Sequence, residues 1–120
     1  MVKVLIVDDD SSIQFIFKKI LLLYGFEIVG IADNGEEAVN LFKSLSDKPD
    51  VILMDYRMPV KNGIEATKEI LQINHHTKII FTSADNSIKK EALSIGAMGF
   101  QEKPFKIKEL ISKIQKLIET

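Results

Sequence analysis

Residues 50–63, DVILMDYRMPVKNG, decide the fold. The apolar run at 51–54 ends at the carboxylate of Asp55, and the turn-forming residues Pro59 and Gly63 follow. A short apolar run between turn residues is typical of a strand buried on both faces of a parallel sheet. In open parallel sheets, function lies just beyond the carboxyl ends of the strands. The stretch therefore predicts a buried strand that places Asp55 at a functional edge.

The rest of the chain repeats this pattern of a strand followed by a helix. The alternation predicts one α/β domain over residues 1–120, with helices on both faces of a five-stranded parallel sheet. The expected arrangement is flavodoxin-like and doubly wound, with strand order 2-1-3-4-5. The predicted strands are 2–7, 26–31, 51–54, 78–82 and 98–101, and the predicted helices begin near 11, 35, 63, 87 and 107.

The first predicted helix follows three consecutive aspartates. Ser11 or Ser12 is the expected N-terminal cap, Asp10 is expected to be capping or solvated, and Gly25 stops the helix. Apolar residues recur there at the spacing of one buried helix face, so this face is expected to pack on the sheet. They are Ile13, Ile16, Phe17, Ile20 and Tyr24.

The composition is that of an ordinary folded domain. The 120 residues are 46% hydrophobic and 28% charged, and the formal net charge is −1. This balance gives no reason to expect binding to nucleic acid or to a membrane. Without cysteine there are no disulfides or thiolate chemistry, and no apolar run approaches the roughly 20 residues that span a bilayer. No signal peptide is apparent, so a cytoplasmic location is expected. The chain is also expected to be a monomer.

Three carboxylates follow predicted strands: Asp8 and Asp9 follow the first, and Asp55 follows the third. These strands are neighbours in the order 2-1-3-4-5, about 4.8 Å apart, so the acids are expected to share one pocket. Two like charges about 4 Å apart repel each other by roughly 4 kcal/mol at an effective dielectric of about 20. Such a cluster takes up protons or binds a cation, and its hard oxygen ligands favour Mg²⁺.

Hydroxyl and ammonium groups are expected at the same edge. The fourth strand ends at Thr82 and Ser83, whose hydroxyls can bind an anion, and Lys103 follows the fifth strand. Acids with a metal, a hydroxyl and a lysine suit phosphoryl transfer, with the Asp55 carboxylate as nucleophile and an acyl phosphate as product. Alone, each residue would more simply be a helix cap, a turn residue or a surface lysine. Their joint placement favours the phosphoryl site.

The ordered set of residues at the strand ends has a known counterpart. Its members are Asp8-Asp9, Asp55, Met58-Pro59, Gly63, Ser83-Ala84, Gly96-Ala97 and Lys103-Pro104-Phe105. Together they span nearly all of the chain, and the set is specific although no single motif is. The chain resembles a receiver domain of two-component response regulators, and most closely the single-domain chemotaxis regulators.

The resemblance implies a signalling function. Asp55 is expected to accept a phosphoryl group from a histidine kinase or a phosphotransfer protein, with Mg²⁺ as cofactor, and the Lys103-Pro104 peptide is expected to be cis. The chain would catalyse only its own phosphorylation and dephosphorylation. The implied metal ligands are Asp8, Asp9, Asp55 and the backbone carbonyl of Arg57, and the implied phosphoryl ligands are Ser83 and Lys103.

The resemblance also implies a switch and an output surface. Ser83 is expected to move toward the phosphoryl group, and Phe100, as the switch aromatic, to fill the space that Ser83 leaves. The signal would then pass through the fourth helix, fifth strand and fifth helix to an unidentified downstream protein. Candidate surface residues are Lys89, Lys90, Ile95, Phe100 and Lys108.

The choice between Thr82 and Ser83 stays open in the sequence. Counting back from Gly96 favours Thr82 as the phosphoryl-binding hydroxyl, because the segment after Ser83 is about two residues shorter than the family's usual length. The four strand residues 79–82 and the small Ala84 that follows favour Ser83. We take Ser83 as the expected ligand.

Arg57 lies two residues after Asp55 and bears on two questions. By the resemblance, Arg57 and Asp85 would flank the phosphoryl group at positions where side chains set the rate of attack by water, and an Arg–Asp pair would shield the acyl phosphate. The alternative function, a small Mg²⁺-dependent phosphohydrolase with an aspartyl nucleophile, usually needs an acid at the position of Arg57.

A flavin-binding electron carrier is disfavoured, because three acids occupy the loop after the first strand where a flavin phosphate would bind.

Overall fold

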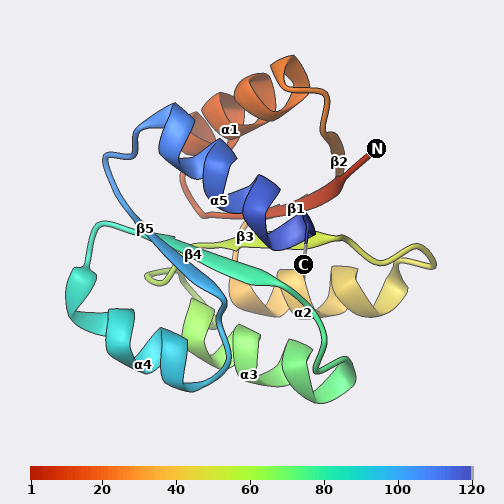
Figure 1. Cartoon of the computed structure of the whole chain (residues 1–120). Helices are drawn as coiled ribbons and strands as arrows, with labels where there is room; N and C mark the ends of the chain where they lie inside the picture. Colours follow the sequence, from red (N-terminus) through yellow and green to blue (C-terminus); the bar gives the residue numbers. More distant parts are fainter. Residues whose placement is uncertain (120) are drawn as a thin grey trace.

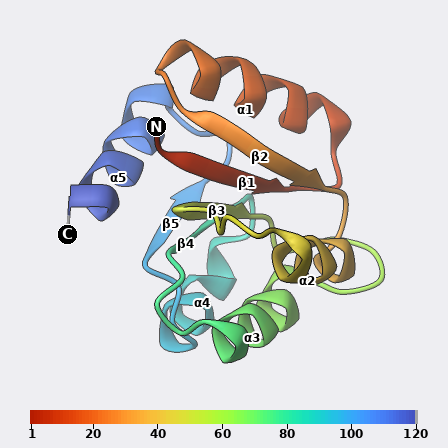
Figure 2. The same ribbon diagram turned by 90° about the vertical axis from the view of Figure 1, so that its right-hand side faces the viewer.

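The computed structural model describes residues 1–119 as alternating strands and helices (Figure 1). The strands are β1 (Lys3–Val7), β2 (Glu27–Ala32), β3 (Val51–Met54), β4 (Ile79–Ser83) and β5 (Gly99–Glu102), and the helices are α1 (Ser11–Leu23), α2 (Gly35–Ser44), α3 (Gly63–Ile73), α4 (Lys89–Ser94) and α5 (Ile107–Glu119). All strand pairs are parallel, in the order β2-β1-β3-β4-β5, which confirms the predicted fold. Figure 2 shows α1 and α5 on one face of the sheet and α2, α3 and α4 on the other.

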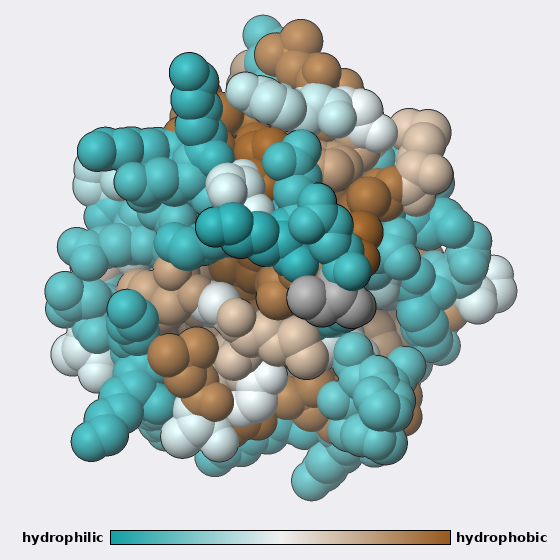
Figure 3. All heavy atoms as spheres, viewed as in Figure 1, coloured by the Kyte–Doolittle hydropathy of each residue, from teal (hydrophilic) through white to brown (hydrophobic). Residues whose placement is uncertain are grey.

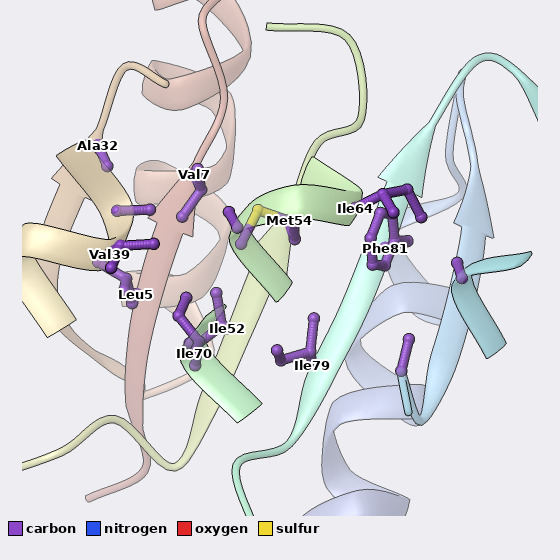
Figure 4. Packing of buried hydrophobic residues seen from close by; sticks show 14 of the residues in the cluster. Leu5, Val7, Ala32, Val39, Ile52, Met54, Ile64, Ile70, Ile79 and Phe81 are labelled. Carbon is purple, nitrogen blue, oxygen red and sulfur yellow. The ribbon is translucent and has the colours of Figure 1, made fainter. Parts of the chain in front are cut away.

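Two hydrophobic layers hold the helices to the sheet, because successive strand residues point to opposite faces. Figure 4 shows the layer under α2, α3 and α4, in which Ile52, Met54 and Phe81 meet Ile64 and Ile70. The layer under α1 and α5 joins strand residues to helix residues, among them Val4, Ile6, Leu53, Phe17, Leu110 and Ile114. Each fully buried large side chain contributes about 1.5–3 kcal/mol. β3 lies at the centre of both layers, as its unbroken apolar run predicted.

The predicted buried face of α1 was partly wrong. Ile16 and Tyr24 are 43% and 46% exposed, whereas Leu21, which was not assigned to that face, is fully buried beside Phe17 and Ile20. The periodicity could not separate the two sides of this helix, because its solvent side is also apolar. Phe15, Leu22 and Leu23 are all exposed there.

The N-terminal cap of α1 is Asp10, not Ser11 or Ser12. Its carboxylate accepts hydrogen bonds from the backbone N–H groups of Ser12 and Ile13 at 2.8 and 3.3 Å. This confirms the expected capping role of Asp10, and its negative charge suits the positive end of the helix. The helix ends at Leu23, two residues before Gly25, whose φ of +82° is readily adopted only by glycine.

The other elements differ from prediction mainly at their ends. β2 begins one residue later than predicted, because the backbone N–H of buried Phe26 bonds back to the carbonyl of Leu21. β4 includes Ser83, and a 3₁₀ turn, Asn86–Ile88, precedes the short α4. The Asp85 carboxylate caps this turn by accepting a hydrogen bond from the backbone N–H of Ser87. The capped 3₁₀ turn thus separates β4 from helix α4.

Figure 3 shows hydrophilic side chains over much of the face on which α5 lies, and hydrophobic side chains near the top, over α1. None of the helices within residues 1–119 combines the length and the apolar character needed to cross a bilayer.

Candidate functional site

Three carboxylates meet at the carboxyl edge of the sheet. Asp8 and Asp9 follow β1, Asp55 follows β3, and one oxygen of each lies within 4.8 Å of the others. Asp8 is fully buried and Asp55 is 8% exposed, whereas Asp9 lies at the surface. The edge is held in register because the Asp55 N–H donates to the carbonyl of Val7 at 2.9 Å. The predicted meeting of the three acids is therefore confirmed.

Backbone N–H groups orient the two buried acids. Asp8 Oδ1 accepts the N–H of Asp10, and Asp55 Oδ1 accepts the N–H of Tyr56, each at 2.9 Å. The chain then turns tightly against Gly63, where an added Cβ would lie 2.0 Å from the Asp55 carbonyl oxygen. Only glycine fits at this close approach. Gly63 thus keeps the loop folded over the acid that the strand presents.

Lys103 reaches into the acidic cluster from the loop after β5. Its Nζ lies 2.7 Å from Asp8 Oδ2 and 3.4 Å from Asp55 Oδ1, and its side chain is only 16% exposed. Burial lowers the pKa of Lys103, but hydrogen bonds and charge attraction from Asp8 and Asp55 outweigh it, so the pKa is raised overall. The ammonium group therefore stays charged. The Lys103-Pro104 peptide is cis, as expected.

The pKa of Asp55 is raised by burial and by the crowding of the acids. Burial and, next, the charge of Asp8 raise the pKa of Asp55 to about 6, although Lys103 and the Tyr56 N–H act in the opposite direction. One ammonium group does not neutralise three carboxylates, so the cluster favours a further cation. Three convergent hard oxygen ligands fit Mg²⁺, which takes carboxylate ligands and shares its remaining positions with water or phosphate oxygens.

Replacing Asp55 by asparagine is expected to stabilise the metal-free protein at neutral pH. The pKa of Asp55 rises from its ordinary 3.8 to about 6 on folding, so its ionised form opposes folding. The penalty is absent below about pH 4, grows as the pH rises to about 6, and then stays constant. Asparagine removes it, and we expect a gain of about 1–2 kcal/mol at about pH 7.5, because water in the open cleft screens part of the effect.

Urea unfolding in EDTA at about pH 7.5 and about pH 4 measures this gain. It should nearly vanish at the lower pH. Glu91→Gln, which neutralises an exposed acid on α4, is the control and should change stability little. A variant less stable than wild type at neutral pH would refute the proposal that ionised Asp55 opposes folding.

Hydroxyl and charged groups form the rim of the same cleft, which has a volume of about 680 Å³. Ser83 is 2% exposed and lines the cleft, and its Oγ accepts the N–H of Asp85 at 3.0 Å. The expected pairing of Arg57 with Asp85 is present, with Nη2 2.8 Å from Oδ2, and the Arg57 side chain is 77% exposed. The pair therefore lies at the mouth of the cleft, where solvent enters.

Phe100 lies outside the cleft, whereas Ser87 lies within it. Phe100 does not line the cleft; it is 8% exposed and packs beside Phe81, its register partner, under α4. Ser87 was missed, although it lines the cleft and its hydroxyl bonds to Asp85. The spacing Asp85-x-Ser87, a common turn signal, could have indicated this contact. The six residues predicted to bind the metal or the phosphoryl group all line the cleft: Asp8, Asp9, Asp55, Arg57, Ser83 and Lys103.

Known proteins match this chain over nearly its whole length. Residues 4–115 match the response regulator receiver domain family. The chemotaxis protein CheY of Thermotoga maritima is 41% identical over 117 residues, which is 96% of each chain. CheY of Borrelia burgdorferi, solved with CheX, BeF₃ and Mg²⁺, superposes with a TM-score of 0.93 at 29% identity, over 97% of this chain and 88% of that one.

A second solved relative carries the same ligands. The response regulator TrrA of Thermotoga maritima, in complex with Mg²⁺ and beryllium fluoride, has a TM-score of 0.88 and 34% identity, over 98% of this chain and 99% of that one. Mg²⁺ thus accompanies this fold in relatives, and the acidic triad of this chain suits it. Receiver domains partner with histidine kinases. The chain belongs to the response regulator receiver domains: it is CheY-like, receives a phosphoryl group on an aspartate with Mg²⁺ as cofactor, and is not a conventional enzyme.

Proposed function

We propose that Asp55 is the phosphoryl acceptor, and that the donor is the phosphohistidine of a histidine kinase or of a phosphotransfer protein. A carboxylate oxygen of Asp55 attacks phosphorus, the phosphorus–nitrogen bond breaks, and its electron pair returns to the imidazole nitrogen. The product is an acyl phosphate on Asp55. The observation that carries this proposal is the position of Asp55, buried beside Asp8 and Lys103 yet lining the open cleft.

The residues around Asp55 would bind the metal ion and the phosphoryl group. Asp8, Asp9, Asp55 and the backbone carbonyl of Arg57 would hold Mg²⁺, which when bound neutralises charge on the phosphoryl oxygens. Lys103, already 3.4 Å from Asp55, pairs with a phosphoryl oxygen, and the Ser83 hydroxyl donates a hydrogen bond to another. Because Lys103 already lies beside Asp55, only small movements of Lys103 and Ser83 are needed when the phosphoryl group arrives.

The assignment of Ser83 rather than Thr82 has a direct test. Ser83 lines the cleft, whereas Thr82 is fully buried and does not, which supports Ser83. We expect Ser83→Ala to slow phosphoryl uptake from acetyl phosphate about tenfold or more, through the loss of one donor to the transferred group. Thr82→Val should leave uptake near the wild-type rate. The reverse result, measured by the rate of the mass increase, would assign the hydroxyl to Thr82.

The downstream face of this proposal is α4, β5 and α5. Phe100 lies on β5, three residues before Lys103, and packs beside β4, which ends in Ser83, so it can respond to movement of that hydroxyl. Lys89 and Lys90 on α4 and Lys108 on α5 are exposed, and Ile95 at the end of α4 is half-buried. We expect an unidentified downstream protein to bind this surface.

Arg57 is expected to lengthen the life of the acyl phosphate. Its guanidinium group, held by Asp85 at the mouth of the cleft, limits the approach of water to the phosphoryl group. Arg57→Ala should shorten the half-life about two- to fivefold, because an exposed ion pair has only a modest effect. Decay of the phosphorylated protein after removal of the donor measures it, with Arg57→Lys as the charge-preserving control. An unchanged half-life in the alanine variant would end this assignment.

A further inference from the structure

Two polar side chains lie side by side beneath α5, on the face of the sheet opposite to Phe100. Thr82 on β4 and Gln101 on β5 are register partners in neighbouring parallel strands. Ile80 belongs to the layer under α1 and α5, whereas Phe81 and Phe100 belong to the layer under α4. The alternation along each strand therefore directs Thr82 and Gln101 toward α5.

Gln101 ties β5 to α5. Its side-chain oxygen accepts a 2.6 Å hydrogen bond from Lys113 Nζ on α5, and the residue is 5% exposed. Its Nε2 makes two longer contacts, 3.4 Å to Glu109 Oε2 and 3.5 Å to the Glu102 carbonyl. Both contacts are at the limit of hydrogen-bond length, so the amide donors are weakly held.

The hydroxyl of Thr82 is a buried acceptor beside this amide. Thr82 is 0% exposed, and its Oγ1 has no hydrogen-bond partner among residues 1–119. A buried polar atom without a partner is unfavourable, and a nearby donor that turns to it removes the penalty. The carboxamide of Gln101 donates to Glu109 on α5 and to the Glu102 carbonyl, and it could instead turn an N–H toward Thr82 Oγ1 within the sheet.

We propose that Gln101 is a positioning residue that couples the phosphoryl site to α5 by exchanging its amide hydrogen bond between Glu109 and Thr82. In one arrangement the amide holds α5 through Glu109. In the other it donates to Thr82 and releases that contact, while Lys113 stays on the side-chain oxygen. Two arrangements close in free energy form a bistable element that a small displacement can shift.

The displacement comes from the strand ends, and this step rests on the proposed function. Thr82 immediately precedes Ser83, Gln101 lies two residues before Lys103, and the Lys103 N–H donates to the Ser83 carbonyl at 2.9 Å. When Ser83 and Lys103 draw in to a phosphoryl group, the separation of Thr82 and Gln101 changes with them. The signal thus reaches α5 by a polar route that is separate from the apolar packing of Phe100.

Hydrogen exchange of the α5 backbone tests this route, with beryllium fluoride and Mg²⁺ as the probe. In wild type we expect exchange in the α5 segment around Leu110 and Ile114 to change about threefold or more on addition of the probe. Thr82→Val and Gln101→Leu should reduce this response to less than about 1.5-fold, whereas Thr82→Ser, which keeps the hydroxyl, should retain it. Gln115→Leu, an exposed change on the same helix, is the matched control and should also respond as wild type.

The outcomes separate this proposal from the function on which it rests. A normal mass increase with acetyl phosphate in Thr82→Val, together with loss of the α5 response, supports the coupling. A full α5 response in Thr82→Val, no α5 response in wild type, or an equal loss in Gln115→Leu would overturn the coupling alone. Absence of any mass increase in wild type would overturn both.

Discussion

Replacing Lys103 by methionine is expected to slow phosphoryl uptake about 10²- to 10³-fold, the range found when a preorganised group that stabilises transition-state charge is removed. The ammonium group lies 2.7 Å from Asp8 and 3.4 Å from Asp55 and is mostly shielded from water. Charge develops on the phosphoryl oxygens where that group can reach it with only a small movement. Methionine keeps an unbranched side chain, one atom shorter, and removes the terminal ammonium with its charge and donors.

Lys103→Met is also expected to change the protonation of Asp55 before the phosphoryl group is transferred. Without Lys103, two forces that lower the pKa of Asp55, its attraction to the ammonium and the hydrogen bond from it, are lost. More of the carboxyl is then protonated near neutral pH, and a protonated carboxyl is a poor nucleophile. The rate deficit of Lys103→Met should therefore shrink as the pH is raised from about 6 to about 8.

The measurement is the rate of mass increase with acetyl phosphate and Mg²⁺, followed across this pH range. Lys106→Met, an exposed change in the same loop, is the control for loss of a positive charge and should remain within about twofold of wild type. If Lys103→Met took up the phosphoryl group at the wild-type rate, Lys103 would have no part in transfer.

Replacing Asp55 by asparagine is expected to abolish phosphoryl uptake altogether. The other two acids are poor substitutes: Asp8 is fully buried and paired with Lys103, and Asp9 lies at the surface. Asparagine has the same shape and retains an oxygen that can accept the Tyr56 N–H, so the cleft should keep its form. Since this variant is also expected to be more stable than wild type without metal, loss of uptake could not be attributed to unfolding.

Much of this site could be predicted from the sequence because it depends on strand ends. The first, third and fourth strands were recognisable as apolar runs, although the second was weaker and the fifth was short. A parallel sheet brings the residues that follow its strands to one edge. That logic placed Asp8, Asp55 and Lys103 together across a separation of 95 residues. The pairing of Arg57 with Asp85 was expected from the family resemblance, which places both residues beside the phosphoryl group.

The residues that sequence reasoning missed depend on directions that a pattern does not record. Both sides of α1 are apolar, so only packing against the sheet reveals that Leu21 is buried and Ile16 is exposed. The polar pair of Thr82 and Gln101 becomes visible only when the register of β4 against β5 is known. Ser87 required the turn after β4, whose shape depends on the cap formed by Asp85.

The central claim is that the carboxylate of Asp55 receives the phosphoryl group. Its most direct test is intact-mass measurement of wild type and Asp55→Asn after incubation with acetyl phosphate and Mg²⁺, followed by peptide mapping of the adduct. The account predicts one added phosphoryl group of roughly 80 Da on wild type, carried by the peptide that contains Asp55, and none on the variant. An adduct of the same mass and extent on Asp55→Asn would contradict it.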